Sequence, residues 1–286
     1  KSIVGSGLTL DKYGWNLVSA KLSNNTFTII HDALKWAVAE IMASSGVNVT
    51  VEVLHHFVSH LTPEQNQAFG SGQPVARRRN GLVPDLKFTL DHPNFNPNPI
   101  LGEIKRCNQG KYAYSVPQNL HQVKRRAGQI AGEYKRKAAR ADELTGQIPG
   151  QGPVTQALNA FPEIVPIIFG HYSECNPRFL QLLSALADRA ARKLHSVARR
   201  NPSLANYSGA LYWAYTRKMG LLSAKLSANF LMDRLPHVTV GAARVASRRA
   251  FSYNSYVNSL ETQRVMDLWA FSGRSRSTRA GSSRFL

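Results

Sequence analysis

Two short segments with alternating side chains, joined by a turn rich in proline and asparagine, constrain this chain most. The first segment, VPDLKFTL (83–90), alternates polar and apolar residues and predicts a strand. The turn DHPNFNPNP leads into a second predicted strand, ILGEIKRC (100–107). A hairpin of these strands can place Asp85 beside Glu103, with Lys105 one step along the same face. Two carboxylates and an amine in one cluster suit a divalent cation and a phosphate group.

The remaining periodicity predicts an α/β fold, a small mixed sheet flanked by helices, followed by a basic helical region. Helical spacing of apolar residues predicts a first helix over 28–45, ended by Gly46, and alternation predicts a strand over 47–57. A helix over 119–144 and a buried strand over 163–170 follow the hairpin. The order is therefore helix, three strands, helix, strand.

Three further helices are predicted near 177–200, 203–235 and 255–271, before a tail rich in Arg and Ser. We divide the chain into an N-terminal extension (1–27), an α/β core (28–172), a basic helical region (173–272) and a disordered tail (273–286).

The chain is strongly basic, with 36 Lys and Arg against 17 Asp and Glu and a net charge of +19. This charge predicts a polyanionic partner, nucleic acid before an acidic membrane or a protein. The cations that we expect at the nucleic-acid interface are Arg77, Arg78, Arg79, Arg106, Lys111, Lys124, Arg125 and Arg126.

Two features bound the compartment. The chain has no run of about 18 apolar residues, so we expect no membrane partner. Its two cysteines, Cys107 and Cys175, are far apart and have no metal-binding spacing. We therefore expect a reducing compartment and an intracellular location, the nucleus included.

The hairpin carries a motif that resembles a known family. Pro84 and Asp85, then seventeen residues, then Glu103-Ile104-Lys105 resemble the signature of the PD-(D/E)XK (restriction-endonuclease-like) nuclease superfamily. That family's core has the element order predicted here, with the aspartate on the second strand and the ExK on the third. The string VKRRAGQIAGEYKRKAARAD is also similar to stretches in proteins of mobile elements. The resemblance covers about half of the chain.

The resemblance implies an endonuclease that hydrolyses phosphodiester bonds of DNA, for a mobile genetic element. It implies Mg²⁺ or Mn²⁺ held by Asp85, Glu103, the carbonyl of Ile104 and a helix-one glutamate, for which Glu40 is the match. Lys105 would position the attacking water and offset charge, and Gln129 would face the site from the following helix. Cutting both strands of DNA needs two sites, which a homodimer would supply. The alternative is a non-catalytic nucleic-acid-binding or packaging protein that keeps a nuclease-like fold.

Several residues have a simpler structural interpretation. His31 lies on the apolar face of the first helix, which predicts a core histidine, and Tyr134 lies on the apolar stripe of the later helix. We expect packing roles for Trp36, Trp213, Trp269 and Cys107, and no metal site at His55, His56 and His60.

Overall fold

The computed structural model describes residues 2–3, 8–9, 26–52, 57, 82–107, 116–144, 146–170, 173–197 and 203–234. All of these lie in one compact unit, residues 1–243. The predicted Arg/Ser tail and the predicted helix over 255–271 lie outside the described residues.

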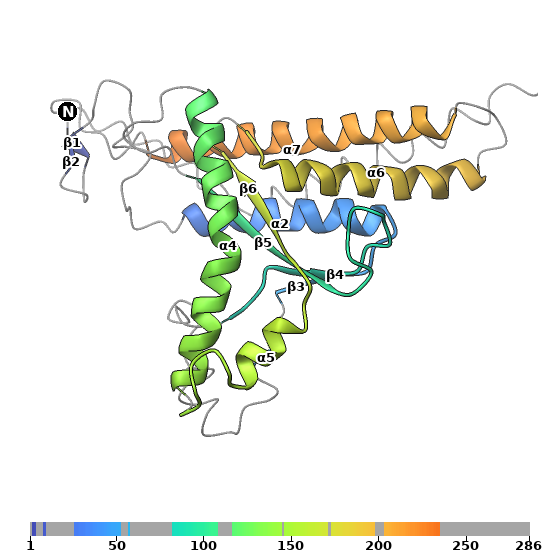
Figure 1. The fold of residues 1–286 in the computed structure, drawn as a ribbon. Helices are drawn as coiled ribbons and strands as arrows, with labels where there is room; N and C mark the ends of the chain where they lie inside the picture. Colours follow the sequence, from blue (N-terminus) through green and yellow to red (C-terminus); the bar gives the residue numbers. More distant parts are fainter. Residues whose placement is uncertain are drawn as a thin grey trace, which may run out of the picture. The chain divides into compact units, whose positions relative to one another are not determined.

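A four-stranded mixed sheet holds the hairpin (Figure 1). Its order is β3-β4-β5-β6, with β3, β4 and β5 antiparallel and β6 parallel to β5. The parallel pair is joined by a helical crossover, as parallel neighbours require. The strands are β3 (Val49–Val51), β4 (Leu86–Phe88), β5 (Ile100–Arg106) and β6 (Ile164–Phe169).

Five helices accompany this sheet in the described part of the chain. They are α2 (Thr26–Ser44), α4 (Val116–Leu144), α5 (Pro153–Asn159), α6 (Pro177–Val197) and α7 (Leu204–Arg234). Helices α4 and α5 share a core cluster with Leu101 of β5 and Ile168 of β6, whereas α6 and α7 run side by side and contact α2. A separate small pair, β1 (Ser2–Ile3) and β2 (Leu8–Thr9), lies near the N-terminus. None of the described helices is long and apolar enough to cross a membrane.

The predicted element order is confirmed from α2 to β6, with α5 as an addition. The strands are shorter than predicted, because β3 ends where Glu52 takes a left-handed backbone conformation (φ 51°). Strand β4 begins only after Pro84, which has no N–H to give to a ladder. The predicted boundary at 172/173 falls between elements that pack together, because α6 contacts both β6 and α2.

Helix α2 follows its sequence closely. Its apolar stripe of Leu34, Val38, Ile41 and Met42 is buried. Gly46, at φ 77°, ends the helix as predicted, because glycine adopts this conformation without a Cβ clash. The N–H of Val47 then donates to the carbonyl of Met42 at 3.0 Å, which closes the last turn.

A buried carboxylate fixes the corner between α4 and α5. Asp142 has no solvent exposure and accepts hydrogen bonds from the N–H of Val154 (2.9 Å), the N–H of Thr155 (3.2 Å) and the Thr155 hydroxyl (2.6 Å). Gly152 permits this approach, since a Cβ there would lie 2.5 Å from Asp142 Cγ. The carboxylate thus satisfies backbone N–H groups that the first turn of α5 leaves without helical partners.

Replacing Asp142 by Ala should therefore lower the free energy of unfolding by about 2–4 kcal/mol, because three buried donors lose a charged acceptor. Chemical denaturation measures the loss. The control is Glu143→Ala at the exposed neighbouring position, which should change stability by less than about 0.5 kcal/mol. Equal losses in the two variants would contradict this role of Asp142.

Candidate active site

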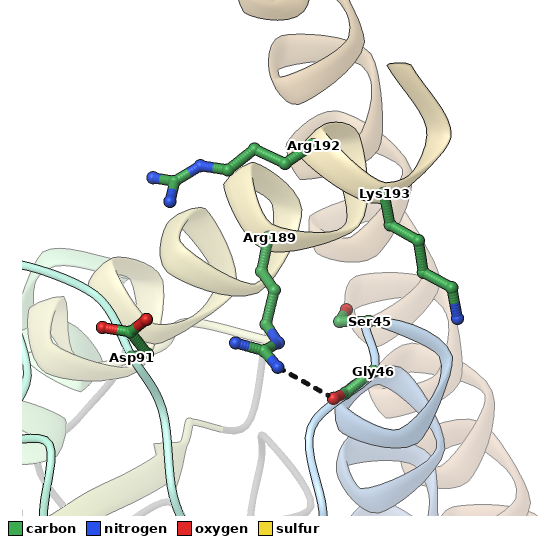
Figure 2. A pocket seen from close by; sticks show the side chains of 6 residues that line it. All are labelled: Ser45, Gly46, Asp91, Arg189, Arg192 and Lys193. Atoms are coloured by element: carbon green, nitrogen blue, oxygen red, sulfur yellow. Dashed lines mark hydrogen bonds between the residues drawn. The ribbon is translucent and has the colours of Figure 1, made fainter. Parts of the chain in front are cut away.

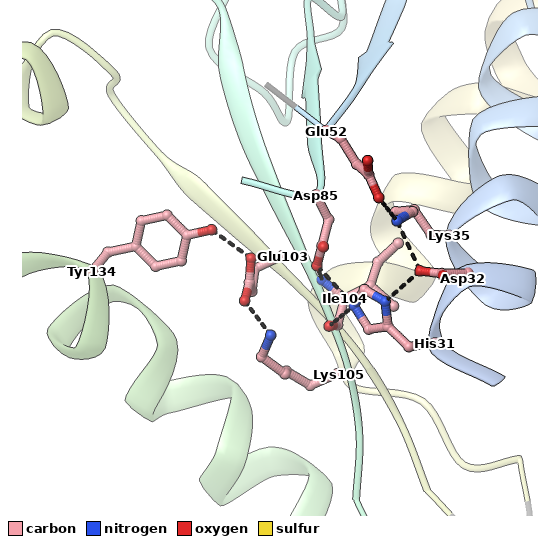
Figure 3. Close-up of polar contacts among 9 residues, drawn as sticks. All are labelled: His31, Asp32, Lys35, Glu52, Asp85, Glu103, Ile104, Lys105 and Tyr134. Carbon is pink, nitrogen blue, oxygen red and sulfur yellow. Dashed lines mark hydrogen bonds and ion pairs between the residues drawn. The ribbon is translucent and has the colours of Figure 1, made fainter. Parts of the chain in front are cut away.

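Asp85 lies directly before β4 and joins three parts of the chain. Because Leu86 pairs with Gly102 in the antiparallel ladder, the preceding residue, Asp85, comes opposite Glu103. The Asp85 side chain is only 13% exposed. Its Oδ2 accepts the backbone N–H of Ile104 at 2.7 Å and lies 3.2 Å from Nε2 of His31 (Figure 3).

His31 of α2 is the residue at the candidate site that the sequence reasoning did not place there. Its Nε2 lies 3.1 Å from the carbonyl oxygen of Ile104 as well as 3.2 Å from Asp85, and its Nδ1 lies 3.2 Å from Oδ1 of Asp32. The prediction of a satisfied core histidine holds for its hydrogen bonds, since both ring nitrogens face oxygen acceptors, but a quarter of the side chain is exposed, so His31 lies at the edge of the core. The available signal was a second charged residue, Lys35, one turn further along the same helix.

Lys35 extends this polar group toward the end of β3, where Glu52 lies. It is 2% exposed, donates to Oδ1 of Asp32 at 2.9 Å and forms an ion pair with Glu52. A buried ammonium needs such partners, because an unpaired charge in the interior is strongly unfavourable. Asp32 therefore contacts both Lys35 and His31, and it orients the imidazole toward Asp85 (Figure 3).

Glu103 lies on the face of β5 that α4 covers. The residue is 4% exposed. Its carboxylate accepts a hydrogen bond from the hydroxyl of Tyr134 and pairs with the ammonium of Lys105. Tyr134 is buried in the core as predicted, but its hydroxyl also holds the carboxylate. The structure thus places the predicted Asp85, Glu103 and Lys105 on adjacent β-strand segments, with Ile104 between them.

Burial and neighbouring charges shift the pKa values of Asp85 and Glu103 in opposite directions. Burial raises the pKa of Glu103, and the neighbouring charge of Asp85 adds to that effect, against the attraction of Lys105. Burial alone would raise the pKa of Asp85, but the hydrogen bond and charge of His31 outweigh it and lower that pKa. For His31 burial acts in the other direction and would lower the pKa, but the hydrogen bond and charge of Asp85 raise it overall. The two carboxylates therefore influence one another's ionisation, and Asp85 loses its proton at a lower pH than Glu103.

Asp85 and the Ile104 carbonyl offer oxygen atoms of the kind that hard divalent cations bind, but the described residues contain no cluster of three or more His, Cys, Asp or Glu side chains that could hold a metal ion. Ligand atoms at right angles around such an ion, each about 2.1 Å from it, lie about 3 Å apart. The separations of 3.1 and 3.2 Å from His31 Nε2 to Ile104 O and Asp85 Oδ2 are of that size, and they are equally the lengths of ordinary hydrogen bonds. Asp85, the Ile104 carbonyl and His31 would supply three donors, with Glu103 beside them.

Two predicted site residues have other surroundings. Glu40 follows His31 by nine residues, which is about 13 Å along the helix and on its opposite side, and its carboxylate pairs with Lys218 at 2.9 Å. Gln129 is exposed on α4 and accepts a hydrogen bond from Arg126 at 3.4 Å. The residue of α2 that contacts Asp85 is His31, whereas Glu40 pairs with Lys218.

The predicted nucleic-acid contacts divide by exposure. Lys124 and Arg125 are exposed on α4, while Arg126 pairs with Glu133. Arg106 is a correction: it points inward, donates to Ser227 Oγ at 2.7 Å and has a pKa lowered by burial to about 10, so it is a structural residue. Outside the described residues lie Arg77, Arg78, Arg79 and Lys111.

The aromatic predictions are partly wrong. Trp36 and Trp213 are 51% and 61% exposed, because each lies on the outer face of its helix rather than in the core. The packing role of Cys107 agrees with its pKa, which burial raises, so a reactive thiolate is disfavoured. Outside the described residues lie Trp269, His55, His56 and His60.

Comparison with protein-family models, with curated proteins and with solved structures finds no significant match to this chain.

The contact between Tyr134 and Glu103 can be tested by stability. Tyr134→Phe removes a donor to a buried carboxylate and should lower the free energy of unfolding by about 1.5–3 kcal/mol. The matched control is Tyr215→Phe, whose hydroxyl contacts the neutral Ser45 hydroxyl at 3.1 Å and should contribute about 0.5–1.5 kcal/mol. Denaturant titration of both variants measures the difference. An equal or smaller loss in Tyr134→Phe would show that the hydroxyl does not support Glu103.

Proposed function

We propose that this protein is a divalent-metal-dependent nuclease that hydrolyses phosphodiester bonds, with DNA as the expected substrate. One observation carries the proposal: His31 Nε2 lies 3.2 Å from Asp85 Oδ2 and 3.1 Å from the Ile104 carbonyl oxygen, next to the strand residues Glu103 and Lys105. The resemblance to PD-(D/E)XK nucleases supports the same assignment, and the mobile-element origin remains a proposal of that resemblance alone.

Asp85, the Ile104 carbonyl, His31 and Glu103 are the residues that would hold Mg²⁺ or Mn²⁺. A bound divalent ion supplies positive charge that polarises a phosphodiester and lowers the pKa of a bound water. Asp32 supports His31, since ligating histidines commonly give their second ring N–H to a carboxylate. Ile104 contributes twice, because its N–H fixes Asp85 and its carbonyl faces His31.

Lys105 is the residue that we assign to the attacking water. Its side chain is one-third exposed, so its ammonium reaches solvent while it pairs with Glu103. There it can hold a water molecule and offset negative charge that develops on the phosphoryl oxygens. Tyr134 keeps Glu103 turned toward Lys105, which fixes the distance between acid and amine.

The surface of α4 supports a polyanionic substrate. Helix α4 begins after β5 and carries exposed cations on its outward side, and phosphate contacts of this kind supply most of the affinity for nucleic acid. The exposed cations of α4 are Lys124, Arg125, Lys135, Arg136 and Arg140.

A second candidate is a non-catalytic nucleic-acid-binding protein. It is favoured by the engagement of Glu103, whose two oxygens already contact Tyr134 and Lys105, and by His31, which lies between the oxygens that a cation would contact. Such a protein would bind nucleic acid with a steep salt dependence but would not cut it in Mg²⁺ or Mn²⁺.

Nicking of supercoiled plasmid in Mg²⁺ or Mn²⁺ separates the two candidates. For the nuclease, Asp85→Ala and Lys105→Ala should each lower the cleavage rate by at least about 100-fold, because the first removes a metal ligand and the second removes the ammonium that offsets charge in the transition state. Binding of the same DNA, measured by fluorescence anisotropy in EDTA, should change by less than about threefold. The control is Lys225→Ala, an exposed lysine of α7, which should cut normally. Undiminished cleavage in both site variants would refute the assignment, and DNA binding without cleavage by the wild type would favour the second candidate.

The exchange of Glu40 for His31 in the donor set gives a separate prediction. His31→Ala should weaken Mn²⁺ binding, measured by isothermal titration calorimetry, by at least about tenfold, because one nitrogen donor is lost. Glu40→Gln should bind Mn²⁺ like the wild type, because Glu40 pairs with Lys218 instead. The reverse result would restore Glu40 as a ligand and remove His31 from the site.

A further inference from the structure

A cavity of about 370 Å³ lies away from the candidate active site. It is formed where the last turn of α2 and the segment after β4 meet α6 (Figure 2). Gly46 follows His31 by fifteen residues, which corresponds to about 22 Å along the axis of α2. A group bound here would therefore be a different one from the group at Asp85. The residues that line the cavity are Ser45, Gly46, Asp91, Arg189, Arg192 and Lys193.

Three cations of α6 make the lining of the cavity positively charged. Arg189, Arg192 and Lys193 follow the spacing i, i+3, i+4, which brings them to one side of the helix. Like charges at this spacing repel one another and destabilise a helix. Within the described part of the chain, none of the three forms an ion pair that would offset this cost. Their neighbour Asp188 is engaged elsewhere, by His92 at 3.4 Å and by the Ser208 hydroxyl.

Arg189 is already held in place. Its Nη2 donates to the carbonyl of Gly46 at 3.2 Å, at the C-terminal end of α2 where the helix dipole favours a cation. One guanidinium carries five N–H donors, so this contact leaves others for a ligand. Asp91 is the one carboxylate among the lining side chains, and three cations with one anion leave the lining with a charge of +2.

We propose that this cavity binds a phosphate group, either free or in a nucleic-acid backbone. Arginine and lysine together supply the fork-shaped and point-like donors with which proteins hold phosphate oxygens. The volume lies within the range of small-ligand sites and holds a phosphate with hydrating water. Asp91 opposes the bound anion and weakens its binding. The proposal does not depend on nuclease activity, because no residue of the cavity belongs to the candidate active site.

Inorganic phosphate tests the site itself, by isothermal titration calorimetry at low salt. The double variant R192A/K193A should weaken phosphate binding at least about tenfold, because it removes two exposed charged donors. Asp91→Asn should strengthen binding, by about two- to fivefold, since it removes the opposing charge. The control R217A/K225A removes two exposed cations of α7 and should leave phosphate affinity unchanged. Equal weakening by the two double variants, or no strengthening in Asp91→Asn, would overturn the proposal.

A DNA duplex in EDTA tests the backbone source, by anisotropy across a range of salt concentrations. If a backbone phosphate occupies the cavity, R192A/K193A should lower the slope of log affinity against log salt by about 1, and the control pair should not. If free phosphate binds as predicted and this slope is unchanged, the site takes a free phosphate. The EDTA measurement contains no cleavage, so a protein that binds in this way but never cuts DNA would refute only the nuclease proposal.

Discussion

The hydrogen bond from the Ile104 N–H to the Asp85 carboxylate, at 2.7 Å, is the contact on which the arrangement of this site depends. It continues the pairing of β4 with β5 past the point where the backbone ladder stops, and it replaces a ladder bond by a side-chain bond. The same oxygen also forms a hydrogen bond with His31, so one carboxylate connects α2 to both strands. A carboxylate that accepts such bonds stays ionised despite its burial, which agrees with its lowered pKa.

The sequence was sufficient to predict that these strands exist, in which order they follow, and that Asp85 comes opposite Glu103, although the strands are shorter than predicted. Alternation with period two places Leu86, Phe88 and Leu90 on a buried face, and the structure confirms all three. The relation between Asp85 and Glu103 follows from a single choice of register, because a slip of one residue would turn the apolar side chains of β4 to the other face of the sheet. For this reason a hairpin read from sequence alone located the acids and the amine.

Helical residues were harder to place, because helix periodicity assigns a face but not what that face meets. His31 belongs to the buried side of α2, and the sequence does not show that this side ends against the polar edge of β4 and β5. Trp36 fails for the opposite reason, since a large apolar residue was assumed to be buried although its position on α2 faces outward. The total charge of a sequence likewise does not show which charged side chains reach the surface. Arg106 counts toward +19, yet its side chain bonds to Ser227 inside the fold, while Arg192 and Lys193 remain exposed.

The charges at the candidate active site explain why a fold would retain it. Asp85 and Glu103 repel one another, and burial makes that repulsion stronger than it would be in water. Without a bound ion, His31 and Lys105 supply the opposing charge, His31 to Asp85 and Lys105 to Glu103. Apolar residues of similar volume would commonly be at least as stable as such buried pairs. Two buried carboxylates compensated by His31 and Lys105, with Lys105 one-third exposed to solvent, are not the arrangement that stability alone would favour, and this supports the proposal of metal and phosphate chemistry at this site.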